Sequence, residues 1–302
     1  MNGREKGFLL LTSHLGDPDR KVLTVPQLRV LAQAVAGSDA PDEHREVAEQ
    51  DLMDLGFNRS SAARILQLLS EQERLDNYLY FGKRSNCLPI TRVSQNYPRR
   101  VRIRLGLDSP GCLWAKGDPA MLTMPAISVV GSRNLRKENL EFAKQVGRQA
   151  ALQGLVLVSG NARGADTVAQ EACLKNGGKV ISVVADCLQD QPLRENVLYL
   201  SEDGYDLPFS AQRALSRNRV IHALGNAAVV VQCSLEKGGT WDGTCKNLKN
   251  GWSPVYCFDD GSEAAARLLQ MGAHALAAEQ LCCLQELKAD ANLFDQSETG
   301  VL

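Results

Sequence analysis

Three short segments rich in glycine, hydroxyl side chains and basic residues are the parts of this chain whose residue types could do chemistry. A glycine lets backbone N–H groups come close to a phosphate, and an arginine adds a charged, two-pronged donor. Where a helix follows, the positive end of its dipole also favours an anion. These segments predict phosphate binding, and their residues of interest are Gly131, Ser132, Arg133, Ser159, Gly160, Arg163, Gly164, Gly238, Gly239 and Thr240.

A fourth motif, Arg217-Asn218-Arg219, places two arginines around an asparagine within a predicted helix at 209–224. Arg213 precedes Arg217 by four residues, so the two share a helix face. Such a cluster could grip phosphates, or it could act as a structural hub of hydrogen bonds. The sequence leaves both interpretations open. Each glycine segment likewise fits an ordinary turn between a strand and a helix.

Motifs for other chemistries are missing from the sequence. The turn after residue 130 is not Gly-x-Gly-x-x-Gly, and no Gly-x-x-x-x-Gly-Lys-Ser/Thr loop is present. No believable nucleophilic triad appears, and four histidines and nine cysteines show no metal-ligand spacing. We therefore expect no catalytic residue, no cofactor and no metal, and we expect the thiols to be reduced in a cytosolic protein.

The overall charge gives no general attraction for nucleic acid, since 34 Lys and Arg stand against 35 Asp and Glu in 302 residues. A nucleic-acid site must then be local. Segment 83–104 has basic residues and no acidic one, so it is either an electropositive surface or a solvated stretch balanced from elsewhere. No apolar run approaches the ~20 residues that span a bilayer, and no secretory signal is evident. We expect a cytoplasmic protein without a membrane partner.

The elements that must position these segments begin near residue 125, where short apolar runs alternate with helical patterns. Near-continuous apolar runs are typical of buried parallel strands, and the alternation predicts a doubly wound, mostly parallel α/β sheet with helices on both faces. The carboxyl ends of such strands meet at one edge, so the glycine segments should converge there. The strands are predicted at 126–130, 155–158, 180–185, 227–231 and 254–258.

The first 80 residues have helical periodicity, with helices expected to start near Thr24, to span 42–55 and to start again near Ser60. They predict a small helical domain, with a hint of a helix-hairpin unit. We divide the chain into a helical domain at 1–80, an α/β domain at 81–276 and a short tail at 277–302.

Residues from about 96 to 276 also resemble the DNA-processing protein A (DprA/Smf) family. The resemblance implies a Rossmann-like fold that binds single-stranded DNA, loads the recombinase RecA in natural transformation or recombination, and works as a homodimer without catalysis. It also implies that Arg133, Lys175, Arg217 and Arg219 contact phosphates. The matching stretches are Tyr97-Pro98, 113–117, 127–133, 159–166, 200–202, 217–221 and Gly239-Thr240.

Two other functions remain open. The chain could be a nucleotide-binding sensor, as in phage defence, or a phosphoribohydrolase-like enzyme of the same superfamily, with Asp242 as its acid. It could also be a protein–protein adaptor whose basic segment is merely solvated. If it binds single-stranded DNA, Trp241 or Trp252 would be the expected platform for an unpaired base.

Overall fold

The computed structural model describes residues 1–36 and 46–287, and the first part of the chain is helical. Leu52, Ile65 and Leu68 are buried in a core that these helices share. Helices were predicted in this region, but the helices at 3–12 and 72–84 were missed, and part of the helix predicted at 42–55 lies outside the described residues. The helices are α1 (Gly3–Thr12), α2 (Val25–Ala36), α3 (Glu49–Asp54), α4 (Arg59–Ser70) and α5 (Gln72–Arg84).

A single nine-stranded sheet organises the rest of the chain, in the order β1-β2-β6-β5-β4-β3-β7-β8-β9. Neighbouring strands pair in parallel, except that β2 pairs antiparallel with both β1 and β6. The mostly parallel, doubly wound sheet is thus confirmed. The strands are β1 (Leu88–Thr91), β2 (Cys112–Lys116), β3 (Ala126–Val130), β4 (Val156–Ser159), β5 (Val180–Val183), β6 (Val197–Ser201), β7 (Ala228–Val230), β8 (Val255–Phe258) and β9 (His274–Leu276).

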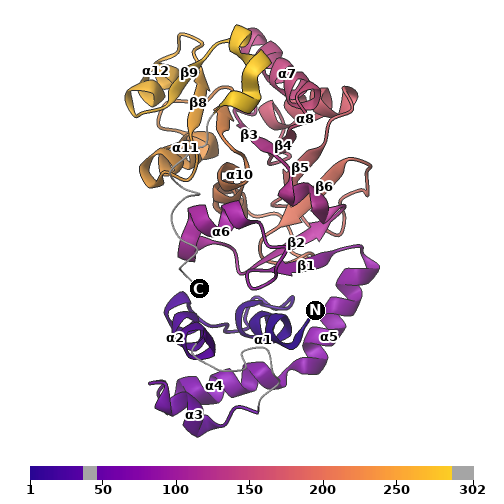
Figure 1. The fold of residues 1–302 in the computed structure, drawn as a ribbon, viewed down its shortest axis with the longest axis vertical. Helices are drawn as coiled ribbons and strands as arrows, with labels where there is room; N and C mark the ends of the chain where they lie inside the picture. Colours follow the sequence, from indigo (N-terminus) through magenta and orange to yellow (C-terminus); the bar gives the residue numbers. More distant parts are fainter. Residues whose placement is uncertain (37–45, 288–302) are drawn as a thin grey trace.

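Helices cover both faces of this sheet (Figure 1). Successive residues of β3 point to opposite faces, so Ile127 and Val129 join one core while Ala126 and Val130 join the other. Helices α7 (Lys137–Leu152) and α8 (Ala165–Lys175) pack on the first face. The second face is covered by α6 (Arg99–Leu105), α10 (Asn218–Leu224) and α12 (Glu263–Gln270), with α11 (Gly238–Asn250) at its margin.

The packing of α7 on α8 depends on Gly147. This residue is buried within α7, and a Cβ atom there would overlap the carbonyl oxygen of Ala169 in α8. The added carbon would also lie 3.0 Å from the Cβ of Ala172. Glycine therefore lets the two helix backbones approach closely.

The helical part and the sheet part are in contact. Tyr78 of α5 packs against Trp114 of β2, with ring centroids 5.3 Å apart, and its hydroxyl donates to Asp206 at 2.6 Å. The boundary predicted at residue 80 falls inside α5, so a division into separate domains stays a prediction. The predicted tail includes a 3-10 segment, Ala278–Glu286, whose Leu281 and Leu284 are buried against the first face of the sheet.

Two negative observations apply to the described part of the chain. None of its helices is long and apolar enough to cross a membrane. No three histidine, cysteine, aspartate or glutamate side chains within residues 1–36 and 46–287 gather closely enough to hold a metal ion.

Candidate nucleic-acid interface

The candidate site lies where the strand order changes direction. From β3 the chain adds β4, β5 and β6 on one side, and it then returns to place β7, β8 and β9 on the other. Loops that leave neighbouring strands at such a switch point diverge and open a crevice, where open α/β sheets bind their ligands. The loops after β3, β4 and β7 all reach this point, as the sequence predicted for their glycine segments.

Two adjoining cavities occupy the crevice. We name the first after Asp186 and the second after Thr240, because each of these residues lines only one of the two. The Asp186 cavity measures about 420 Å³ and the Thr240 cavity about 490 Å³. Arg163 and Gly160 line the first, whereas the N-terminus of α11 lines the second. These volumes are typical of small-molecule and nucleotide sites. The residues that line both cavities are Arg133, Asn134, Ala162, Phe209, Ala214 and Arg217.

Arg217 ties the loop after β4 to the start of α11. It is buried at the junction of α9 (Ala211–Ser216) and α10, and its Nη2 donates to the carbonyl of Gly160 at 2.9 Å. Its Nη1 donates to Asn218 Oδ1 at 3.2 Å, and Asn218 Nδ2 donates in turn to the carbonyl of Gly239 at 3.0 Å. The sequence left open whether this motif binds phosphates or forms a hub of hydrogen bonds. For Arg217 and Asn218, these contacts favour the hub.

A buried carboxylate faces the same hub. Asp166, in the first turn of α8, accepts the backbone N–H groups of Gly160 at 3.0 Å and Ala162 at 3.2 Å. Burial raises the pKa of Asp166, and the positive charge of Arg217 opposes that rise. Burial likewise lowers the pKa of Arg217, and Asp166 opposes that change. The two side chains therefore stabilise each other's charged forms inside the loop.

The glycines of these loops serve packing more than phosphate contact. A Cβ at Gly160 would overlap the guanidinium of Arg217, and one at Gly131 would overlap Ala165. Gly164 has a φ of 95°, and a Cβ there would collide with the backbone of Arg133. Gly238 differs, because its φ is 83° and no atom of residues 1–36 and 46–287 lies within 4 Å of the added carbon. A ligand can therefore reach the backbone N–H groups at the start of α11.

The hydroxyl groups among the predicted site residues are used inside the protein. Ser159 is fully buried, and the other two hydroxyls tie one loop to another. We therefore leave these side chains out of the contacts proposed below. Their partners are the carbonyl of Gly131 for Thr240 at 3.0 Å, the carbonyl of Gln232 for Ser132 at 3.2 Å and the side-chain amide of Gln170 for Ser159 at 2.5 Å.

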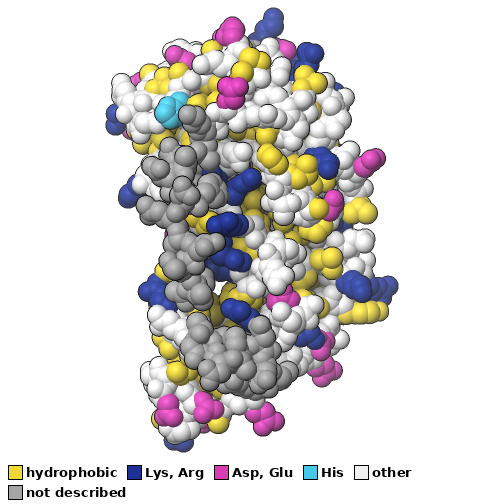
Figure 2. Space-filling view, in the orientation of Figure 1, with side chains coloured by type: hydrophobic (Ala, Val, Ile, Leu, Met, Phe, Trp, Pro, Cys, Tyr) yellow, Lys and Arg dark blue, Asp and Glu magenta, His cyan; other side chains and the backbone are white. Residues whose placement is uncertain are grey.

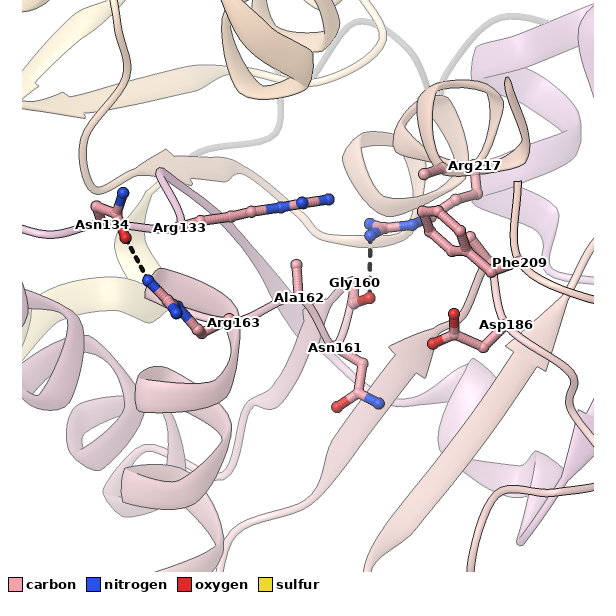
Figure 3. A pocket seen from close by; sticks show the side chains of 11 residues that line it. Arg133, Asn134, Gly160, Asn161, Ala162, Arg163, Asp186, Phe209 and Arg217 are labelled. Atoms are coloured by element: carbon pink, nitrogen blue, oxygen red, sulfur yellow. Dashed lines mark hydrogen bonds between the residues drawn. The ribbon is translucent and has the colours of Figure 1, made fainter. Parts of the chain in front are cut away.

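Arg133 is the cation that remains available to a ligand. Its side chain is exposed, and its guanidinium has no hydrogen-bond or ion-pair partner among residues 1–36 and 46–287. Figure 3 shows it extended across the cavity toward Arg217. Arg163 lies at the end of the cavity where the Arg133 side chain begins, and it donates to Asn134 Oδ1 at 2.6 Å (Figure 3). Lys237, exposed at the start of α11, adds a third accessible positive charge.

Two residues that the family resemblance named lie away from these cavities. Lys175 ends α8, and the 11 residues of that helix place it about 16 Å from the end that faces the site. Arg219 lines a different cavity, of about 740 Å³, between the sheet and the N-terminal helices. Its Nη2 pairs with Glu202 at 2.8 Å and its Nε donates to the carbonyl of Asp108 at 3.0 Å. The structure does not bring either residue to the Arg133 site.

Glu202, which pairs with Arg219, should make the stability of the folded protein depend on pH. Burial raises the pKa of Glu202 to about 7, although Arg219 opposes the rise. Because the folded protein holds this proton more tightly than the unfolded chain, the stabilisation is complete below pH about 4.5 and is lost as the pH rises through about 7. Replacing Glu202 with glutamine should therefore remove roughly 1–3 kcal/mol of the difference in unfolding free energy between pH 5 and pH 8.

Denaturant unfolding of wild type and Glu202→Gln at both pH values measures this effect, and subtracting the two proteins removes the contribution of other titrating groups. Glu195→Gln is the control, since Glu195 is exposed and the charge change is the same. An unchanged pH dependence in Glu202→Gln would contradict the assignment.

The basic segment 83–104 serves mainly to hold backbone carbonyls. Arg100 donates to the carbonyl of Leu224 at 3.3 Å, and Arg104 donates to that of Ala223 at 3.0 Å, so both bind the carboxyl end of α10. That end of a helix carries partial negative charge, which favours a cation. Figure 2 shows Lys and Arg side chains gathered along the middle of the molecule. Arg100 and Arg104 are therefore neither balanced by acidic side chains from elsewhere nor merely solvated.

The aromatic residues differ from the prediction. Trp252 is buried in the second core, and Trp241 packs against the same core. Phe209 lines both cavities with 55% of its surface exposed, and the sequence analysis did not select it. Asp242, the acid that the hydrolase alternative named, pairs with Lys246 at 2.8 Å and lines neither cavity.

Comparisons with known proteins agree with this architecture. Residues 89–286 match the family described as DNA recombination-mediator protein A. The chain is 30% identical over 206 residues to the DNA processing protein DprA of Bacillus subtilis, which covers 63% of this chain and 68% of that protein. It is 27% identical over 237 residues to Protein Smf of Escherichia coli, covering 74% of this chain and 62% of that protein.

Two solved structures have the same fold. The X-ray structure of DNA processing protein A from Streptococcus pneumoniae aligns with a TM-score of 0.73 and 25% identity, over 95% of this chain and 99% of that one. The Helicobacter pylori protein, solved for its mode of binding single-stranded DNA, aligns with a TM-score of 0.55 and 24% identity, over 65% and 94%. Since the family match spans most of the sheet and all three loops of the site, this chain belongs to the DNA recombination-mediator protein A family.

Proposed function

We propose that this protein binds the sugar–phosphate backbone of single-stranded DNA at the Asp186 and Thr240 cavities. The observation that carries the proposal is Arg133, an exposed guanidinium without a partner among the described residues, held at the point where three strand-end loops converge. Arg163, Lys237 and the N–H groups at the start of α11 add donors for further phosphates. An exposed ring at Phe209 favours unpaired bases, which can stack on it, over a duplex.

Membership of the family extends this proposal to a cellular role. We propose that the bound strand is handed to a recombinase of the RecA type during transformation or recombination, without bond cleavage by this chain. The family description as a recombination mediator supports that role. We also propose a homodimer, which would place two such sites side by side on one strand. A cytoplasmic location is supported by the nine unpaired cysteines, which suit a reducing compartment.

Titration of a fluorescently labelled oligonucleotide at two salt concentrations tests the binding site. Wild-type affinity should fall steeply with salt, because phosphate contacts release counterions. Arg133→Ala should weaken binding about tenfold and reduce the slope of log affinity against log salt by about one, with unfolding free energy changed by less than about 0.5 kcal/mol.

The matched control is Arg148→Ala, which removes one exposed arginine from α7 outside both cavities. It should bind like wild type. Salt-independent binding, or equal affinities for wild type and Arg133→Ala, would refute the proposed site. Tight binding of a mononucleotide without binding of the oligonucleotide would favour the sensor function instead.

A further inference from the structure

The Asp186 cavity has two chemically different sides. Arg133 and Arg163 supply positive charge on one side, and Arg217 lies beside Phe209 on the other (Figure 3). The other side is formed by Phe209 and Asp186, and Figure 3 shows the carboxylate beneath the aromatic ring. A phosphate needs only the first side. The second side offers an apolar face next to a hydrogen-bond acceptor, a combination that suits a nucleobase.

The polar side chains on this second side can form hydrogen bonds with a ligand, and the charge of Asp186 also acts on Arg217. Asp186 follows β5 and is exposed, and Asn161 is held in the left-handed region at a φ of 59° in the loop after β4. Neither side chain has a hydrogen-bond partner within residues 1–36 and 46–287. Both line the same cavity as Phe209. An ionised aspartate only accepts hydrogen bonds, whereas an asparagine amide both donates and accepts.

A carboxylate on the Watson–Crick edge distinguishes the four bases. Guanine presents two adjacent donors, N1–H and the N2 amino group, which match the two oxygens of a carboxylate. Adenine and cytosine each present an amino group beside a ring nitrogen that repels the second oxygen, and thymine presents one N–H between two carbonyls. Asn161 can add a donor to guanine O6. The acceptor at Asp186 therefore fits guanine and no other base.

We propose that the Asp186 cavity binds one guanine nucleotide of the bound strand, with Phe209 stacked on the base and Asp186 accepting from N1–H and N2. The inference rests on the proposed binding of single-stranded DNA and assigns the base that this site prefers. The phosphate of the same nucleotide reaches Arg133 and Arg163. The cavity, at about 420 Å³, has room for a single nucleotide.

Competition binding with oligo(dT) strands that differ at one central position tests this preference. One dG should raise the affinity of wild type about tenfold over oligo(dT), while dA and dC should not, and deoxyinosine, which lacks the N2 amino group, should fall between dG and dT. Asp186→Asn should reduce the ratio of dG to dT affinities to about one, and it should raise the affinity for oligo(dT) because a negative charge beside the phosphates is removed.

Two further variants separate stacking from charge. Phe209→Ala should weaken binding of every oligonucleotide about tenfold without changing the salt slope, and Phe209→Trp should restore it. Glu171→Gln, the same change of charge on an exposed residue of α8 that lines neither cavity, should keep the guanine preference. Equal affinities for dG, dA, dC and dT with normal salt dependence would overturn the inference and leave the DNA site standing. Failure of every oligonucleotide to bind would overturn both.

Discussion

Replacing Arg217 with alanine should lower the unfolding free energy by about 3–5 kcal/mol and should also abolish tight binding of oligonucleotides. The side chain is buried, bonds to Gly160 and Asn218, and faces the carboxylate of Asp166. Removal of a buried positive charge leaves the nearby buried carboxylate uncompensated, which is strongly destabilising. Denaturant unfolding monitored by circular dichroism, together with the oligonucleotide titration, measures both losses.

Arg163→Ala is the matched control for this result. It removes an arginine from the same cavity, but that side chain is exposed and, within the described part of the chain, bonds only to Asn134, so unfolding free energy should change by less than about 0.5 kcal/mol. Arg217→Lys should lose most of the stability as well, since an ammonium cannot reproduce the two-pronged contact with Gly160 and Asn218. Wild-type stability in Arg217→Ala would show that the loops are held by other contacts.

Replacing Gly147 with alanine should destabilise the protein by about 2–3 kcal/mol, although alanine is the better helix former. The new methyl group would meet the carbonyl of Ala169, which is backbone and cannot turn aside, so α7 and α8 must separate. Both helices begin at the candidate site, and their separation should weaken oligonucleotide binding too. Thermal and denaturant unfolding provide the measurement.

Gly7→Ala makes the same chemical change where there is room. Gly7 lies within α1, and no described residue comes within 4 Å of the added carbon, so this variant should gain up to about 1 kcal/mol. The two glycine variants should therefore move in opposite directions. Equal shifts would mean that helix propensity, and not the approach of α7 to α8, decides the outcome.

The central strands could be predicted from the sequence because burial on both faces makes them apolar throughout. Residues 126–130 and 180–185 are examples, and they form β3 and β5. Strands β4, β7 and β8 were predicted as well, whereas β1, β2, β6 and β9 were missed. Of these, β2 includes Lys116 and pairs antiparallel, and β9 has three residues, two of them exposed. Their positions are set by neighbours distant in sequence, which periodicity within a segment does not reveal.

The candidate site was predictable to the level of the loops but not of individual side chains. Parallel strands bring their carboxyl ends together, so convergence of the glycine segments followed from strand order alone. An arginine that binds a ligand and one that binds its own backbone have the same letter in the sequence. Arg133 is free among the described residues, whereas Arg217 and Arg219 are occupied by Gly160 and Glu202. Phe209 gave no signal beyond a lone aromatic residue ahead of a helix.

Helix α10 is anchored at both of its ends. Arg217 and Asn218 fasten its start to the loops of the site, while Arg100 and Arg104 fasten its finish to α6. The candidate site is consequently preorganised. Its loops lose their conformational entropy when the protein folds, and not when a ligand binds. Most of the free energy of contact with a nucleic-acid strand is then available as affinity, because little ordering of the protein remains to oppose it.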